Sequence, residues 1–474
     1  MAIIKERRMH GYLRLLGLGA GLVLLAGCAR FSDDGGFAAV QQVSQQHLDK
    51  EVVWARDKAG QDTITQRVAE LLAAPLDVEA AVQVALLNNR GLQARFDELG
   101  IGEAERVQAG RLPNPGFSFG RMVKGSEVEY ERGLHFNLVR LIAMPMVAGM
   151  EAQRFEQLQR QTSLAMLELA SATRKAWYNA VAAEEGLLYA QQVQEAAEIG
   201  AELARRLAAV GNYSKLQQAQ EQNFYAEAAL GLIHAERARV QSREQLARLL
   251  GLWGEQVAFQ LPERLPELPK AAEAQEAVER LAMSQRLDIQ AVRLDAERLA
   301  RNLGLSRTTR FIKVLELGVA NNRSNEEPTQ RGYEISVELP LFDWSGAKVA
   351  RAEAQYRQAL NRAAETAINA RSQVREAYLG YRAAHDIARH YRDELLPLRA
   401  RIAEEQLLQY NGMFISTFDL LADARRQIQA VQGYLQAQRD FWLAEADLQM
   451  ALLGSADITP SAAPAAASEA PAGH

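Results

Sequence analysis

The chain has one cysteine, Cys28, among its 474 residues, and therefore no disulfide framework of its own. Its formal net charge at pH 7 is only −5, which gives no reason to expect a nucleic-acid partner. Beyond Cys28 no apolar run reaches the ~20 residues that a membrane-spanning helix needs. A helical membrane protein is therefore not expected, and any part of the chain that crosses a bilayer has to be built from strands.

Proline is absent from Met146 to Leu261. Within this stretch small and apolar side chains recur at alternating steps of three and four, among them Phe155, Leu158, Leu169, Ala176, Ala183, Leu187, Val193, Ala197 and Leu207. This pattern predicts helices with one buried face and supercoiled packing, far longer than the ~11 to 12 residues of an ordinary helix. Gly211–Ser214 interrupts the pattern, and Ser214 with Gln217 forms a capping-box signal. We therefore predict a long antiparallel helical hairpin with its tip near Asn212.

The first 27 residues have the features of an export signal, with a basic head followed by an apolar run from Leu15 to Ala26. Leu25-Ala26-Gly27-Cys28 resembles the lipobox of bacterial lipoproteins, which implies a covalent lipid on Cys28 as the first residue of the mature chain. Ala29 follows the cysteine, which in such lipoproteins points to the outer membrane. The alternative is a plain signal peptide with an incidental cysteine.

The rest of the first half reads as an arm, a helix, two strands and the long hairpin. Residues 28–76 are polar and aperiodic, which predicts an N-terminal arm on the outside of the body. Residues 77–261 form the first repeat, with a helix over Asp77–Ala109, strands at about 116–142 separated by a polar loop from Lys124 to Arg132, and the helical hairpin at about 146–250.

The same order returns about 200 residues later, over residues 262–454. A second pair of strands is predicted at about 313–341, with a loop from Asn321 to Arg331, and a second helical hairpin at about 345–453 with its turn at Tyr410–Met413. Pro397 lies in the outgoing limb, where we expect a kink or break. Residues 455–474 are an Ala/Pro-rich tail with little to bury and are predicted to be disordered.

The strand pairs alternate apolar and polar residues, as membrane β-barrels do. Tyr333, Ile335 and Val337 alternate with Glu334 and Ser336, the clearest period of two in the chain. Four strands cannot close a barrel, and in lipid an open sheet edge leaves backbone groups unpaired. The chain is therefore expected to oligomerise, at least as a dimer, unless its strands never meet lipid.

This order of elements resembles the outer-membrane efflux protein family, the TolC-like channels. The segments that carry the resemblance are Tyr333-Glu-Ile-Ser-Val-Glu-Leu-Pro-Leu-Phe-Asp-Trp-Ser-Gly and Tyr410-Asn-Gly-Met-Phe-Ile-Ser-Thr-Phe-Asp-Leu-Leu-Ala-Asp-Ala-Arg. One departure is Arg140-Leu-Ile-Ala-Met-Pro-Met, which replaces the usual passage from strand to helix. The resemblance implies a mostly α fold with a small β part, in which a homotrimer forms a 12-stranded membrane β-barrel joined to a periplasmic α-helical barrel.

No catalytic constellation, phosphate-binding loop or metal-ligand cluster stands out in the sequence, so neither an enzyme nor a resident cofactor or metal is expected. His385 and His390 are five apart on one helix and do not share a face. Met144, Met146 and Met150 could contact a soft metal, but filling an irregular junction is the more ordinary use of methionine.

The candidate functional residues come from the resemblance. In that family, acidic and tyrosine side chains at the second periplasmic turn constrict the entrance, and the matching residues here are Tyr410, Asp419 and Asp423. A trimer would present each as a ring of three, and carboxylate rings favour cations. Ser416 to Asp419 is also a capping-box pattern, so Asp419 could instead only cap a helix. Ile415 stands where the family has a basic partner.

The sequence thus predicts a lipid-anchored outer-membrane channel that extends into the periplasm and passively conducts small molecules in a tripartite efflux system. Its partners would be a periplasmic adaptor and an inner-membrane transporter. Two other classes stay open: a lipid-anchored periplasmic adaptor, which also uses long helical hairpins, and a structural scaffold without a pore. Neither the substrate nor the pump class can be derived from the sequence.

Overall fold

The computed structural model describes residues 29–272, 277–309, 314–338 and 342–455. Within these ranges the chain is mostly helical with one small antiparallel sheet, as predicted. The predicted signal, the lipidation residue Cys28 and all but the first residue of the predicted tail 455–474 lie outside the described residues. No helix in the described ranges combines the length and the apolar character needed to cross a bilayer.

The chain divides into two compact units, which we describe separately. Unit 1 comprises Met1–Val40, Phe96–Thr162 and Ile289–Thr366, and unit 2 comprises Gln41–Arg95, Ser163–Asp288 and Ala367–His474.

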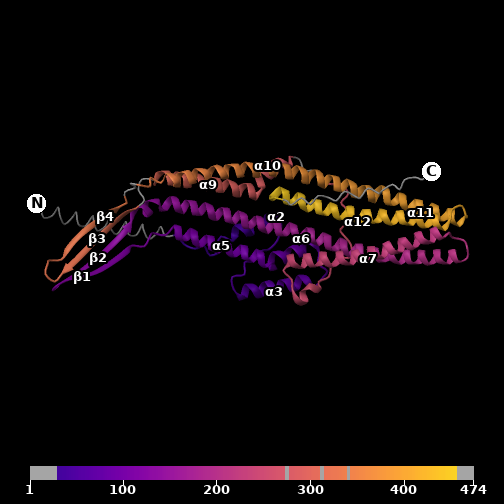
Figure 1. The fold of residues 1–474 in the computed structure, drawn as a ribbon, viewed down its shortest axis with the longest axis horizontal. Helices are drawn as coiled ribbons and strands as arrows, with labels where there is room; N and C mark the ends of the chain where they lie inside the picture. The colour runs from indigo at the N-terminus through magenta and orange to yellow at the C-terminus, as the bar shows by residue number, and fades with distance from the viewer. Residues whose placement is uncertain (1–28, 273–276, 310–313, 339–341, 456–474) are drawn as a thin grey trace. The chain divides into compact units, whose positions relative to one another are not determined.

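The elements follow one another in an order that occurs twice, helix, two strands and long helices (Figure 1). The first set is α2 Ala38–His47, α3 Lys58–Leu72, α4 Val78–Asn88, α5 Arg90–Ala109, β1 Gly116–Lys124, β2 Glu127–Asn137, α6 Leu138–Ala209 and α7 Lys215–Leu250. The second set is the 3₁₀ turn η1 Gly254–Ala258, α8 Val278–Gln285, α9 Leu287–Thr308, β3 Leu315–Ser324, β4 Gln330–Val337, α10 Gly346–His390, the π-helical turn η2 Tyr391–Leu395, α11 Leu396–Asn411 and α12 Thr417–Leu453.

The four strands of unit 1 form one sheet in the order β1-β2-β3-β4, with every neighbouring pair antiparallel (Figure 1). The predicted polar loop from Lys124 to Arg132 is wrong, because β1 and β2 continue into it and join at Gly125, whose φ of 65° suits a tight turn. The predicted loop from Asn321 to Arg331 is also too long, since β3 continues to Ser324. The ends of these strands carry polar side chains, so they lack the apolar alternation that predicts a strand. Backbone pairing does not depend on side-chain polarity, and the strands therefore continue.

The sheet register brings apolar side chains of all four strands onto one face, because directly paired residues of antiparallel strands point the same way. One row across the sheet is Phe117, Leu134, Val319 and Tyr333, and the next contains Phe136, Leu317 and Ile335. All seven side chains are exposed in the chain. Strands β1 and β4 each have one unpaired edge within the described sheet. A single chain therefore leaves both an apolar face and two open edges.

Helix α6 begins at Leu138, earlier than the predicted start near Met146, so the prediction that strand residues extend to about 142 is wrong. Asn137 explains the difference, because its Oδ1 accepts a hydrogen bond from the Arg140 backbone N–H at 2.8 Å and so caps the helix. Pro145 lies within the early part of α6 and removes one backbone donor there.

The first helical hairpin turns where the sequence predicts. Helix α6 ends at Ala209, and Gly211 has a φ of 81°. Ser214 then caps α7, with Ser214 Oγ accepting from the Gln217 N–H and the Gln217 side chain accepting from the Ser214 N–H. The predicted capping box is thus confirmed, and so is the end of the hairpin at about residue 250, where Gly251 with a φ of 67° follows α7.

The second hairpin contains the irregularity predicted at Pro397. The π-helical turn η2 immediately precedes α11, and the Leu396 N–H bonds the Tyr391 carbonyl one residue further back than in an α-helix. Proline lacks an N–H, so a widened turn beside it relieves the broken hydrogen-bond ladder. On α12, a Cβ at Gly433 would come within 2.7–2.9 Å of the Tyr391 ring, so only glycine lets α12 approach η2 this closely.

Two expectations for the first hundred residues are wrong. The N-terminal arm contains helices α2 and α3, and Ile64 and Val68 on α3 are fully buried. The predicted helix over Asp77–Ala109 is broken between α4 and α5 at Asn89, which accepts from the Leu92 N–H and donates to the Leu249 carbonyl. The break satisfies carbonyls at the end of α7, a requirement that is invisible in local periodicity.

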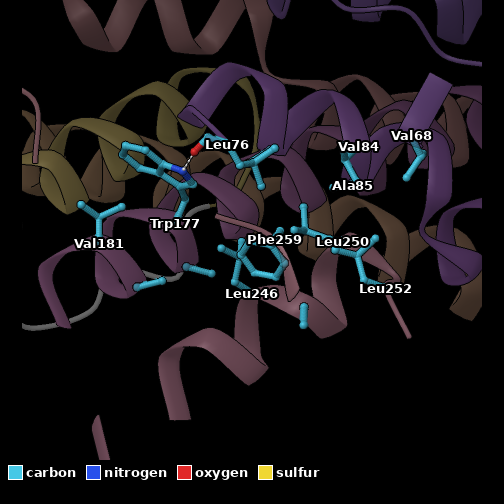
Figure 2. Packing of buried hydrophobic residues seen from close by; sticks show 14 of the residues in the cluster. Val68, Leu76, Val84, Ala85, Trp177, Val181, Leu246, Leu250, Leu252 and Phe259 are labelled. Atoms are coloured by element: carbon cyan, nitrogen blue, oxygen red, sulfur yellow. Dashed lines mark hydrogen bonds between the residues drawn. The ribbon is translucent and has the colours of Figure 1, made fainter. Parts of the chain in front are cut away.

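The core of unit 2 is built around Trp177 of α6, with α3, α4 and α7 and the segment after α7 packed about it. Figure 2 shows the indole pointing at the Leu76 backbone carbonyl, to which Nε1 donates at 2.8 Å. Tyr178 next to it stacks on Trp442 of α12, with ring centroids 5.4 Å apart. This core binds the N-terminal helices and the two long hairpins into one unit.

Candidate functional site

The predicted gate residues lie at the turn between α11 and α12 in unit 2. The turn closes on backbone hydrogen bonds from Gly412 to Leu408 and from Phe414 to Gln409, both at 2.9 Å. Met413 takes a left-handed φ of 60°, and its side chain and that of Phe414 are 92% and 84% exposed. The turn therefore presents two bare apolar side chains at its tip.

Asp419 forms the capping box that the sequence allowed as an alternative. Its carboxylate accepts from the Ser416 backbone N–H at 3.1 Å and from the Ser416 hydroxyl at 2.7 Å. Its own N–H donates to Ser416 Oγ at 3.2 Å. The hydroxyl and then the backbone hydrogen bond of Ser416 lower the pKa of the Asp419 carboxyl. The side chain is exposed and carries a negative charge at neutral pH, so capping and a role at an aperture are compatible in one residue.

Tyr410 lies across the same turn. It is 36% exposed, and its hydroxyl receives a weak hydrogen bond from Thr417 Oγ1 at 3.4 Å. The contact ties the last turn of α11 to the first turn of α12. Tyr410 and Asp419 are thus both held at the turn through residues of the α12 N-terminus.

Asp423 is placed differently, since it is only 3% exposed. Its Oδ1 lies 3.8 Å from the guanidinium of Arg399 on α11 and 3.8 Å from that of Arg426 on α12. The basic groups nearest to it therefore come from the helices and not from the turn, where Ile415 stands. Within one chain Asp423 is therefore buried close to two arginines, one on α11 and one on α12.

The structure adds an ion pair that the sequence reasoning missed. Glu221 of α7 is 2% exposed, and its Oε1 lies 2.5 Å from Nη2 of Arg425 on α12. The contact is not aligned as a hydrogen bond, so the attraction is mainly between charges. The Arg425 guanidinium also lies 4.6 Å over the Phe224 ring. The signal in the sequence is a carboxylate three residues before Phe224, on the buried stripe of α7.

This ion pair joins the two hairpin ends. A Cβ at Gly200 of α6 would lie 3.7 Å from Glu221 and 3.8 Å from Leu421 of α12, so α6, α7 and α12 meet at this point. Tyr213, in the first turn, has a buried hydroxyl without a hydrogen-bond partner among the described residues, and burial raises its pKa, with Glu221 adding to the effect. The two turns lie at the same end of unit 2 (Figure 1). Tyr213, Glu221 and Arg425 thus form one polar cluster, which we call the tip cluster.

A groove of about 760 Å³ begins at this cluster and runs between α6, α7 and α12. Its lining is rich in amide and small side chains, including Asn223, Gln245, Gln432, Ala190 and Gly231. Amides and small residues give a surface on which another helix can pack closely and exchange hydrogen bonds. Among the described residues no group of three or more His, Cys, Asp or Glu side chains could hold a metal ion.

No protein-family model and no curated protein matches the sequence. Solved structures do match. The outer-membrane channel OprN superposes with a TM-score of 0.68 at 16% identity, covering 85% of this chain and 93% of OprN. The chain has the fold of this outer-membrane channel.

Two other solved structures also match this fold. The outer membrane protein VceC of Vibrio cholerae gives a TM-score of 0.64 at 13% identity, over 82% of this chain and 96% of VceC. The open state of the Neisseria gonorrhoeae MtrE outer membrane channel gives 0.61 at 20% identity, over 82% and 89%. The resemblance predicted from the sequence is confirmed as a likeness of fold, and it spans nearly the whole length of these proteins.

Proposed function

We propose that this protein is the outer-membrane channel of a tripartite efflux system, which passively conducts small molecules that an inner-membrane transporter and a periplasmic adaptor deliver. A covalent lipid on Cys28 would anchor it in the outer membrane. The chain would act as a homotrimer, with three sheets closing one 12-stranded barrel and the helical hairpins forming a tunnel that extends into the periplasm.

The observation that carries the proposal is the sheet with one apolar exposed face and two open edges. In water the N–H and C=O groups of an open sheet edge form hydrogen bonds to solvent. In lipid they stay unpaired, and each costs several kcal/mol. Copies of the chain that pair β1 of one with β4 of the next remove every edge. The amide-lined groove supports the same assembly, since helices of a neighbouring copy can pack in it. The number three comes from the resemblance to the TolC-like family, in which three protomers share one barrel.

At the periplasmic entrance, Tyr410, Asp419 and Asp423 would each form a ring of three. Asp419 is more exposed than Asp423, so it is the carboxylate that can reach an opening without rearrangement. Asp423 would reach it only if α11 moved away from α12, because Arg399 of α11 holds it. We therefore assign Asp419 to the resting constriction and Asp423 to a state in which the helices have separated.

The test is single-channel conductance of detergent-extracted, full-length protein in planar bilayers. Asp419→Ala is expected to raise the conductance several-fold, because it removes three carboxylates from the entrance. The matched control is Ser416→Ala, which removes the same helix cap, worth about 1 kcal/mol, but keeps the carboxylates. Equal currents in the two variants would reduce Asp419 to a cap. Folded native protein that carries no current would overturn the channel and leave the pore-less scaffold.

The pH dependence gives a second prediction. The pKa of Asp419 is lowered below its ordinary value of 3.8 by the Ser416 hydrogen bonds. A depressed carboxyl pKa stabilises the folded turn above the unfolded-state value, and this contribution is lost only as pH falls through the lower, folded value. Between pH 7 and 5 the native-to-Asp419→Asn ratio of conductance should therefore stay constant. A ratio that rises from below one towards one in that range would contradict the assignment.

A further inference from the structure

The apolar face of the sheet carries, besides its two apolar rows, four arginines: Arg121, Arg132, Arg323 and Arg331. The register places them in two adjacent rows at the hairpin side of the apolar rows. One row is Phe119, Arg132, Asn321 and Arg331, and the next is Arg121, Tyr130 and Arg323. We call these two rows the arginine belt.

The two faces of the sheet differ in the charge that their side chains carry. Residues of the strands that share the face of the belt include no carboxylate. The opposite face holds five glutamates, which are Glu127, Glu129, Glu131, Glu316 and Glu334. Side chains on opposite faces of a strand point away from each other, so these glutamates do not neutralise the belt.

The belt arginines have no internal partner. All four are exposed, and among the described residues none makes an ion pair or a side-chain hydrogen bond. Arg121 is diagonal to Arg132 across β1 and β2, a separation of roughly 7–8 Å at which like charges repel. A dianionic group between two guanidinium groups would relieve that repulsion and accept bidentate hydrogen bonds from each.

The apolar rows and aromatic rings next to the belt favour a membrane lipid as the source of that anion. Successive rows are about 7 Å apart along a strand, so the belt begins one row beyond the apolar row of Leu134 and Val319. Phe119 and Tyr130 lie within the belt with ring centroids 6.2 Å apart, and aromatic rings of this kind gather at the level of lipid headgroups. A charged row that follows apolar rows and contains aromatic rings has the chemistry of the boundary between acyl chains and phosphates.

We propose that the arginine belt binds phosphomonoester headgroups of anionic lipids in the leaflet that the hairpin ends of the sheet reach. The inference rests on the membrane location of the sheet in the proposed function. In an assembled barrel the belt would form a closed ring of guanidinium groups around the channel. It would fix the depth of the barrel in the bilayer.

The test uses native mass spectrometry of full-length protein in detergent micelles with added phosphatidic acid or phosphatidylcholine at equal mole fraction. The native chain is expected to retain phosphatidic acid preferentially, and 0.5 M salt should abolish the preference. The variant R121Q/R132Q/R323Q/R331Q is expected to retain at least fivefold less. The matched control, R351Q/R357Q/R362Q/R371Q, makes the same charge change at exposed arginines of α10 and should retain as much as the native chain.

If the fourfold variant does not fold, R121Q/R132Q and R323Q/R331Q separately remove one diagonal pair each and should each lose part of the retention. Equal retention of the two lipids by the native chain, or equal loss in the α10 control, would overturn the proposal. So would equally effective competition by glycerol phosphate, which has the same phosphomonoester and no acyl chains. Bilayer conductance separates the two proposals: a conducting native protein without lipid preference would overturn the belt alone, whereas a lipid-selective protein without conductance would overturn the channel alone.

Discussion

Arg425→Met is expected to lower the free energy of unfolding by about 3 kcal/mol, because it leaves the Glu221 carboxylate buried without its partner. Glu221→Gln should cost less, since the Arg425 side chain is 25% exposed and can turn towards water. The double variant should recover most of the loss, because a buried ion pair is often no better than neutral residues of similar volume. The measurement is the denaturation midpoint of detergent-extracted protein, followed by circular dichroism.

A surface ion pair supplies the control. Arg205 Nε lies 2.8 Å from Glu202, but both side chains are exposed, so Arg205→Met should leave the midpoint unchanged. An Arg425→Met variant as stable as the native chain would show that the pair contributes nothing, and that the hairpin ends are held by other contacts. A double variant no more stable than Arg425→Met would show that lost packing on Phe224, and not the unpaired charge, causes the effect.

The tip cluster also has a functional consequence under the proposed function. Glu221 and Arg425 connect α7 of the first hairpin to α12 of the second, so any opening that separates the hairpins within a protomer has to break this pair. Arg425→Met should therefore raise the open fraction of single channels as well as lowering stability. Conductance traces identical to those of the native protein would place the opening motion between protomers instead.

Trp177→Ala is expected to have the larger effect on stability. Trp177 is 2% exposed in the core of unit 2, and truncating a buried tryptophan typically costs about 3–5 kcal/mol through lost contacts and a residual cavity. The Leu76 carbonyl would lose its donor as well, adding about 1–3 kcal/mol if water does not replace it. Because this core holds α3 and α4 against the long helices, protease cleavage of the N-terminal helices should accompany the drop in unfolding midpoint.

Trp177→Phe separates the two contributions, since it keeps most of the ring volume but loses the hydrogen bond to Leu76. Its loss of unfolding free energy should be much smaller than that of Trp177→Ala. As a matched control, Trp253→Ala truncates a tryptophan of the same chain that is 80% exposed and should leave the midpoint nearly unchanged. Equal losses in Trp177→Ala and Trp177→Phe would mean that the hydrogen bond, and not the packing, dominates.

The candidate site was only partly accessible from the sequence. The capping box of Ser416 and Asp419 is a pattern within four residues, so its geometry follows from the sequence. The burial of Asp423 does not, because it depends on Arg399 of a different helix. The Glu221–Arg425 pair joins residues about 200 positions apart, and only the packing of α7 against α12 brings the two charges together.

By itself the sequence determined what depends on near neighbours. The long hairpins, the capping box at Ser214 and the irregularity beside Pro397 all follow from spacing of three and four residues and from the backbone chemistry of Gly and Pro. The alternation in Tyr333–Val337 likewise determined a strand with two chemically different faces.

The tertiary structure decided what depends on distant partners. The Asn89 break exists because the end of α7 needs donors for its carbonyls. Helix α3 is stabilised because Ile64 and Val68 pack into the core around Trp177. Arg132 and Arg331 share one row only through the register of β2, β3 and β4. Register is a property of pairing between segments about 200 residues apart, so the sorting of charge between the two sheet faces became visible only once the strands were paired.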